Sequence, residues 1–269
     1  MSSFLETMAS RSHRRAAETA RSRSLGQRRQ TVMGGPPPRS LGTFGSSFDL
    51  IGEVKPRSPS EGVFPERSHA ETARAYEAGG AGIISVLTEP SEFGGSVGML
   101  QEVTATVSVP VLAKDFLVDP IQVYEAREAG ADGVLVIVRI LSAESLIEIL
   151  DAVSDIGIFA LLEGFDRDDL ELISEVSAGR DNLLAGVNCR DLDTLEVMPE
   201  RHVTLAANIP GDVVTVAESA IGAPADIERI AACGYRAALV GSALMRADDP
   251  AFLVSEMVNA GRRAMTVPS

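Results

Sequence analysis

Eight short apolar segments recur along the chain from residue 49, and their regular spacing limits what it can fold into. They cover residues 49–55, 82–87, 110–115, 133–138, 158–163, 184–189, 212–217 and 237–242. Amphipathic helical patterns such as 119–130 and 223–234 separate them. Asp119 followed by Pro120 is typical of a helix start, and Gly130 and Gly234 are placed to end helices. Apolar strands alternating with helices indicate a parallel sheet buried on both faces.

Eight strand–helix units in succession predict an α/β fold of the (β/α)8 TIM-barrel class, as a single domain over residues 49–269. A doubly wound open sheet is the rival architecture. The even spacing of the units favours a closed barrel. No G-x-G-x-x-G pattern follows the first strand, which further weakens a dinucleotide-binding sheet.

The segment before the barrel, residues 1–48, differs from it in charge. Residues 1–47 hold eight arginines and two acidic residues, whereas the whole chain has a formal net charge of −14. We expect a basic arm with a helix over residues 3–22 that leads into a loop. A cleaved transit peptide and a disordered tail are the alternatives, because Arg-rich, Ser-rich and acid-poor leaders have this composition.

Composition excludes several classes of protein. An acidic barrel is unlike a nucleic-acid binder, whose contact surface is basic. No apolar run approaches the ~20 residues of a membrane span. The two cysteines, Cys189 and Cys233, make no disulfide framework, which favours a reducing compartment and a cytoplasmic location.

The chain uses arginine almost everywhere, and only two of its 24 basic residues are lysines, Lys55 and Lys114. Both follow predicted strands at their C-terminal ends, where barrel enzymes carry their chemistry. Arginine does not deprotonate in proteins, whereas a lysine ammonium can donate a proton. The two lysines are therefore candidates for one reactive site.

Other polar residues end the predicted strands beside these lysines. The set comprises Glu53, Glu163, Asn188, Arg190, Glu218, Ser219, Gly241 and Ser242. Lysines and carboxylates in one desolvated pocket can divide acid and base roles. The polar turns 217–224 and 241–250, with Ser58 after the first strand, predict a site for a phosphorylated ligand. No histidine ends a strand, so we expect His13, His69 and His202 to be surface residues and expect no metal site.

Several segments together resemble the indole-3-glycerol phosphate synthase family. They are EVKPRSPSEG (53–62), SVLTEPSEFGGS (85–96), AKDFLVDPIQVYEAREAGAD (113–132), LLEGFDRDDLE (161–171), GVNCRDLDTLEV (186–197) and residues 215–250. The arm matches more loosely, through residues 4–21. The resemblance implies a barrel enzyme of tryptophan biosynthesis, a carboxy-lyase that needs no metal and no organic cofactor. Its reaction closes the ring of 1-(2-carboxyphenylamino)-1-deoxyribulose 5-phosphate, with loss of CO₂ and water.

The resemblance also implies roles for individual residues. Lys114 would protonate the ribulose carbonyl, while Lys55 and Glu53 would serve substrate binding and dehydration, with Glu53 as general base. Glu163 would position Lys114 or stabilise an iminium-like intermediate. The division of acid roles between the two lysines stays open. The rest of the set consists of Asn188, Glu218 and Arg190 at the anthranilate end, Phe93 and Phe116 against the aromatic ring, and Ser58, Ser219, Ala220, Gly241 and Ser242 around the phosphate.

Two departures from the family pattern stand near this site. Ala220 replaces a usual glycine after Glu-Ser, and Pro56 follows Lys55 where a basic residue is usual. Three alternatives therefore stay open: an Amadori-type isomerase-like barrel, a non-catalytic phosphate binder, and a duplicate of the synthase serving secondary metabolism.

As partners we expect the small phosphorylated substrate and other tryptophan-pathway enzymes, but no nucleic acid and no membrane. We expect a monomer or weak dimer.

Overall fold

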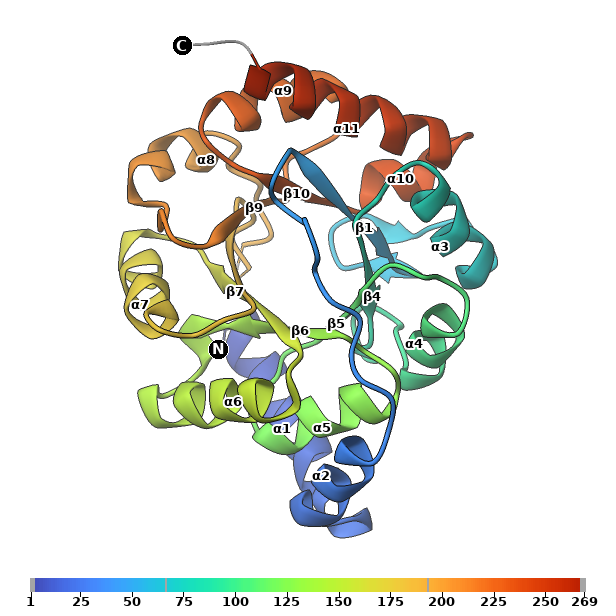
Figure 1. Cartoon of the computed structure of the whole chain (residues 1–269), viewed down its shortest axis with the longest axis vertical. Helices are drawn as coiled ribbons and strands as arrows, with labels where there is room; N and C mark the ends of the chain where they lie inside the picture. Colours follow the sequence, from blue (N-terminus) through green and yellow to red (C-terminus); the bar gives the residue numbers. More distant parts are fainter. Residues whose placement is uncertain (1–2, 66, 193, 267–269) are drawn as a thin grey trace.

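The computed structural model describes residues 3–65, 67–192 and 194–266, which form a closed barrel of parallel strands (Figure 1). The strands follow one another around the barrel in the order β1-β10-β9-β8-β7-β6-β5-β4, and β4 pairs with β1. Their bounds are Asp49–Val54 (β1), Ile83–Leu87 (β4), Val111–Lys114 (β5), Gly133–Ile137 (β6), Phe159–Gly164 (β7), Leu183–Asn188 (β8), Val214–Glu218 (β9) and Ala237–Val240 (β10). The predicted TIM barrel is confirmed, and each strand overlaps its predicted segment.

Alternation along the strands divides the apolar core into two clusters. In β1, Leu50 and Val54 belong to the larger cluster, which lies between the barrel and its helices. Ile51 belongs to the smaller cluster, which fills the barrel interior together with residues such as Leu112 and Leu161. Because strand side chains alternate between faces, the residue two positions after an interior one also points inward. This rule carries polar residues at the strand ends into the barrel mouth.

Helices cover the outside of the barrel in the alternating pattern that the sequence predicts (Figure 1). The longer ones are α3 (His69–Ala78), α4 (Val97–Thr104), α5 (Pro120–Glu128), α6 (Ala143–Ile156), α7 (Arg167–Ser177), α9 (Pro224–Ala232) and α11 (Pro250–Thr266). The short helices are α8 (Arg201–Thr204) and α10 (Ser242–Arg246), with 3₁₀ turns at Val138–Ile140 and Ala206–Asn208. None of the helices in the described residues is long and apolar enough to cross a membrane.

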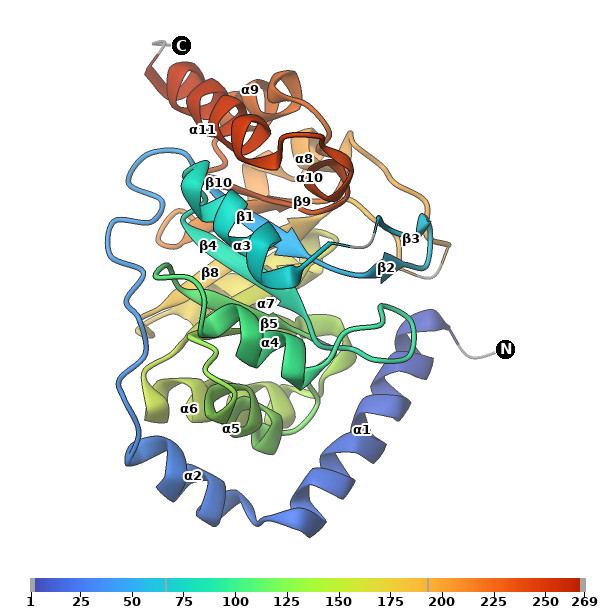
Figure 2. The same ribbon diagram turned by 90° about the vertical axis from the view of Figure 1, so that its right-hand side faces the viewer.

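The N-terminal arm forms two helices that pack along one side of the barrel. The expected helix is present as α1 (Phe4–Ser22), but the expectation of a loop after it was wrong, because α2 covers Leu25–Met33. Ser24 caps α2 through a reciprocal capping box with Gln27, a helix-start signal in the sequence. Figure 2 shows α2 beside α5 and α1 rising from it toward the C-terminal face of the barrel.

Opposite charges attach the arm to the barrel. Arg11 pairs with Glu92 at 2.6 Å, Arg15 pairs with Asp115 at 2.5 Å, and Arg28 pairs with Glu128 at 2.5 Å. The basic arm and the acidic barrel are therefore complementary surfaces of one folded unit.

A small hairpin leaves the C-terminal end of β1, and the sequence analysis did not predict it as strands. It pairs β2 (Arg57–Ser58) with β3 (Gly62–Val63) in antiparallel register. Gly62 has a φ of +75°, a conformation that glycine adopts without penalty. In Figure 2 the hairpin stands out from the same face that the N-terminal end of α1 approaches.

Candidate active site

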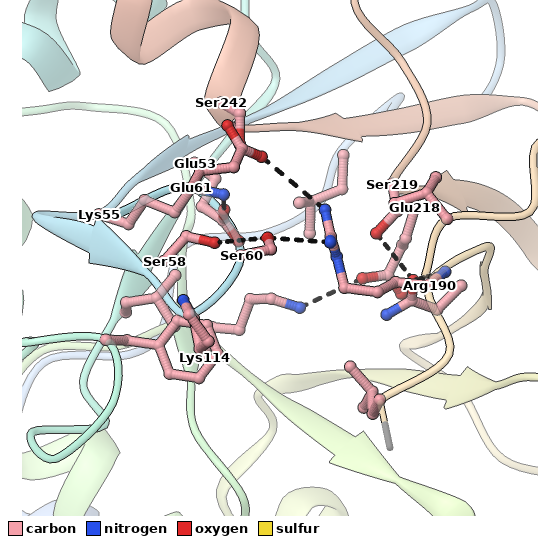
Figure 3. Close-up of a pocket in the computed structure, with 18 of the residues that line it drawn as sticks. Glu53, Lys55, Ser58, Ser60, Glu61, Lys114, Arg190, Glu218, Ser219 and Ser242 are labelled. Carbon is pink, nitrogen blue, oxygen red and sulfur yellow. Dashed lines mark hydrogen bonds and ion pairs between the residues drawn. The ribbon is translucent and has the colours of Figure 1, made fainter. Parts of the chain in front are cut away.

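A cavity of about 500 Å³ opens at the C-terminal ends of the barrel strands. Its size suits a small-molecule ligand. Every candidate residue of the sequence analysis lines it: Glu53, Lys55, Ser58, Phe93, Lys114, Phe116, Glu163, Asn188, Arg190, Glu218, Ser219, Ala220, Gly241 and Ser242. Figure 3 shows many of these side chains converging from different strands. Strand alternation explains the convergence, because Glu53, Lys114 and Glu163 each lie two residues after an interior apolar residue.

Lys114 lies at the centre of a group of carboxylates. Its Nζ is 3.3 Å from Oε2 of Glu163 and 3.3 Å from Oε2 of Glu218. Burial opposes the charge on this ammonium, but the neighbouring carboxylates of Glu163, Glu218 and Glu53 outweigh burial and raise the pKa of Lys114. The lysine is therefore protonated in the resting site, the form that a proton donor requires.

The second lysine forms a separate ion pair in the same cavity. Lys55 Nζ is 2.8 Å from Oε1 of Glu53, and the Glu53 side chain is almost completely buried. Burial alone would raise the pKa of Glu53, but the charges of Lys55 and Lys114 together lower it. Glu53 is consequently an ionised carboxylate, the form that a general base requires.

The pKa of Glu218 is shifted in the opposite direction to that of Glu53. Burial and the charge of nearby Glu163 together outweigh the attraction of Lys114 and raise the pKa of Glu218. One ammonium shared by two buried carboxylates favours keeping a proton on one of them. The site thus holds an ionised carboxylate at Glu53 and a proton-retaining carboxyl at Glu218.

Asn188 connects this group to the neighbouring turn. Its Nδ2 donates to Oε1 of Glu163 at 3.1 Å, and its Oδ1 accepts from Ser219 Oγ at 2.8 Å and from the Arg190 amide at 2.8 Å. These bonds fix which way the amide points and hold Glu163 toward Lys114. The Arg190 side chain reaches across the mouth, where its Nη1 donates to Ser60 Oγ at 2.9 Å (Figure 3).

The end of the cavity near β9 and β10 is built from small polar groups. Ser219 and Ala220 both have left-handed backbone conformations, with φ of +65° and +57°. Gly241 leaves room that a side chain would fill, since a Cβ there would lie 2.3 Å from Oε1 of Glu53. Ser242 begins α10, and Arg246 from the same helix also lines the cavity. Hydroxyls and a guanidinium gathered here suit an anionic group.

Aromatic rings form the other wall. Phe93 and Phe116 lie with ring centroids 6.2 Å apart, and Phe4 from α1 meets Phe116 edge-on at 6.1 Å. All three rings line the cavity. A flat aromatic group has a matching surface beside the lysines.

Some residues of the site escaped the sequence analysis. The hairpin supplies Ser60 and Glu61, α10 supplies Arg246, and the arm supplies Phe4. The motif SPSEG was a signal for the hairpin residues, but it suggested only a hydroxyl at Ser58. Nothing in the local sequence of Phe4 indicates that it lines a cavity whose other residues begin at Glu53.

The expectation that all three histidines lie at the surface was wrong for His202. Its side chain is buried, its ring meets Tyr235 edge-on at 5.4 Å, and its Nε2 is 3.2 Å from the backbone oxygen of Glu218. The carbonyl can only accept, so Nε2 carries the proton.

Cys189 is buried and unpaired, consistent with a packed small residue. Among the described residues, no group of three or more His, Cys, Asp or Glu is arranged to hold a metal ion.

Fold and site together define a class: a (β/α)8-barrel enzyme whose cavity combines lysine–carboxylate pairs, an aromatic wall and an anion-binding end. A sequence model described as indole-3-glycerol phosphate synthase matches residues 11–257. The chain belongs to the indole-3-glycerol phosphate synthase family.

Individual relatives agree. The chain is 44% identical over 213 residues to the indole-3-glycerol phosphate synthase of Mycobacteroides abscessus, covering 79% of this chain and 77% of the relative. It is 41% identical over 249 residues to that of Parafrankia sp., covering 91% of each. Among solved structures, 3-hexulose-6-phosphate synthase from Salmonella typhimurium matches with a TM-score of 0.63 and 17% identity. This match covers 81% of the present chain and 100% of the solved one, and it concerns the fold alone.

Proposed function

We propose that this barrel converts 1-(2-carboxyphenylamino)-1-deoxyribulose 5-phosphate to indole-3-glycerol phosphate, as a carboxy-lyase of tryptophan biosynthesis. One observation carries the assignment to this site: Lys114 between two carboxylates faces the same cavity as the Glu53–Lys55 pair. The substrate has an aromatic carboxylate, a ketone and a phosphate. The aromatic wall, the lysine–carboxylate centre and the hydroxyl-rich end of the cavity suit these three parts in turn.

Ring closure needs a proton donor at the ketone. The ring carbon that bears the carboxylate forms a bond to the ketone carbon, driven by the lone pair of the ring nitrogen. Lys114 donates its proton to the ketone oxygen, which becomes a hydroxyl. The carbon–carboxylate bond then breaks, CO₂ leaves, and its bonding electrons restore the aromatic ring. The carboxylate of Glu163 stabilises the positive charge that the nitrogen carries between these steps.

Dehydration completes the indole and needs one acid and one base. Ionised Glu53 removes a proton from the carbon next to the nitrogen. Lys55, 2.8 Å from Glu53, protonates the departing hydroxyl, which leaves as water. Glu218, whose pKa is raised by burial and by Glu163, holds a proton within reach of Lys114 and can restore the lysine after donation.

Substrate binding uses the remaining residues. Phe93 and Phe116 contact the aromatic ring, and Asn188 and Arg190 line its carboxylate end. The phosphate lies near Ser58, the Ser219–Ala220 turn, Gly241 and Ser242. With a formal net charge of −14, the protein gains no long-range attraction for a substrate with two anionic groups, so these local donors supply the binding energy.

We also propose a cytoplasmic location and action as a monomer or weak dimer, with other tryptophan-pathway enzymes as partners. Two unpaired cysteines, one of them buried, support a reducing compartment.

The test is turnover of the substrate itself. Purified protein is incubated with 1-(2-carboxyphenylamino)-1-deoxyribulose 5-phosphate, indole fluorescence is followed, and the product mass is measured. We expect a fluorescent product lighter by one CO₂ and one water. A parallel reaction offers the phosphoribosyl-anthranilate isomer, whose conversion without loss of mass would instead indicate an isomerase. No product of either kind from folded protein would refute enzymatic function.

A further inference from the structure

The hairpin β2–β3 places an acidic residue at the anion-binding end of the cavity. Ser242 Oγ donates to Oε1 of Glu61 at 2.7 Å, and Arg246 forms an ion pair with Oε2 of the same carboxylate. Arg190 Nη2 lies 3.8 Å from Oε1 (Figure 3). One carboxylate therefore engages a hydroxyl and a guanidinium group from α10 and a second guanidinium group from the segment after β8.

These partners are the kind that recognise a phosphate. Guanidinium groups bind phosphate and carboxylate oxygens through the same donors, and a serine hydroxyl donates to either. Two anions side by side in this corner would repel each other while competing for one set of donors. The Glu61 carboxylate and a ligand phosphate are consequently mutually exclusive occupants.

The tip of the hairpin can carry Glu61 away without disturbing the barrel. Its two strands pair only with each other, at Arg57 with Val63 and Ser58 with Gly62. Val63 is 82% exposed, but Phe64 beyond it is buried and Arg57 donates to the backbone oxygen of Ser91, so the base of the hairpin is anchored and the tip that carries Glu61 is the part that can move. The barrel register of β1 ends at Val54, before the hairpin begins.

We propose that Glu61 is an affinity-determining residue: it occupies the phosphate position in the unliganded protein and must be displaced before the substrate phosphate binds. This inference rests on the proposed function for the placement of the phosphate. When only a fraction of the protein is in the binding-competent state, its apparent Kd equals the intrinsic Kd divided by that fraction. If Glu61 occupies the corner nine tenths of the time, apparent phosphate affinity falls about tenfold.

The experiment measures binding of inorganic phosphate by isothermal titration calorimetry at fixed ionic strength. We compare the wild type with the Glu61→Gln variant and with a control variant, Glu228→Gln. Glu228 on α9 is also paired with an arginine, Arg263 on α11, but this pair lies away from the cavity. We expect Glu61→Gln to bind phosphate about tenfold more tightly and Glu228→Gln to match the wild type.

A structural role for Glu61 predicts the reverse result. If the carboxylate holds Arg190 and Arg246 in place for the ligand, Glu61→Gln weakens phosphate binding. Weaker binding, equal binding, or no detectable binding by either protein would overturn the inference. Glu61→Ala serves as the second variant if the glutamine protein does not fold.

Turnover separates this inference from the proposed function. With the carboxyphenylamino-deoxyribulose phosphate we expect Glu61→Gln to have a lower KM than the wild type. Tighter phosphate binding without any turnover would refute the proposed function and leave the role of Glu61 intact. Turnover in the wild type with unchanged phosphate affinity in Glu61→Gln would refute only the role of Glu61.

Discussion

The Glu53–Lys55 pair can be disturbed without changing either residue, through Gly241→Ala. A Cβ at position 241 would lie 2.3 Å from Oε1 of Glu53 and 3.0 Å from Nζ of Lys55. Ordinary contact begins near 3.4 Å, so the carboxylate must retreat by about 1 Å to accept the methyl group. The backbone at Gly241 has φ −121° and ψ −69°, outside the helical and strand regions, so backbone strain adds to the steric contact.

The size of the effect follows from that displacement. A misplacement of about 1 Å in a catalytic group costs on the order of 10²-fold in rate, or about 2.7 kcal/mol of transition-state stabilisation. Overpacking also destabilises the fold, by about 1–3 kcal/mol. We expect Gly241→Ala to fold, melt a few degrees lower and lose about 10²-fold in kcat/KM.

The assay combines indole fluorescence with thermal unfolding followed by circular dichroism. Gly98→Ala in α4 is the matched control, because the nearest atom to its new Cβ is Ser96 Oγ at 3.8 Å. We expect this control to keep full turnover. Turnover of Gly241→Ala within twofold of the wild type would refute the view that the Glu53 position limits the reaction.

Three further expectations concern single residues. Lys114→Arg should lower kcat by about 10²–10⁴-fold while substrate still binds, because arginine keeps the charge but does not donate its proton. A near-normal kcat in steady-state assays would exclude Lys114 as the acid. Ala220→Gly should raise the free energy of unfolding by about 0.5–1 kcal/mol, because alanine at a φ of +57° is strained. Urea unfolding measures this change, and a lower free energy of unfolding would contradict the prediction. Burial lowers the pKa of His202 to about 4, so the folded protein favours the neutral imidazole. The resulting contribution to the free energy of unfolding is fully present above pH 6.5. It is lost as the pH falls through 4, by about 3 kcal/mol in all. His202→Asn should flatten that acid-side loss in denaturation curves recorded from pH 7 to pH 4, and an unchanged slope would exclude His202 as its source.

The sequence was sufficient for the barrel and for the positions of most site residues. Strand alternation puts Glu53, Lys114 and Glu163 in the interior without knowledge of any partner, because each lies two positions after an interior apolar residue. The closed barrel then brings the strand ends together. These are consequences of a repeating local pattern, which a sequence displays directly.

Contacts between distant segments could not be predicted in the same way. Glu61 meets Arg246 only because the hairpin folds over α10, and its partners lie about 130 and 180 residues further along the chain. The burial of His202 depends on packing against Tyr235 and the end of β9. Which carboxylate keeps a proton depends on distances of about 3 Å around Lys114, and no residue spacing specifies them.

The arm has a further consequence for the order in which the protein is built. Its helices are synthesised before the barrel, yet their ionic partners extend from Glu89 to Asp155. At 5–20 residues per second the arm waits on the order of 10 s for that surface to be synthesised. It then has a complete docking site before β9 and β10, the strands that lead to Glu218 and Gly241, have been made. The arm can therefore dock on α5 and α6 while the last strands are still being made, before the barrel can close.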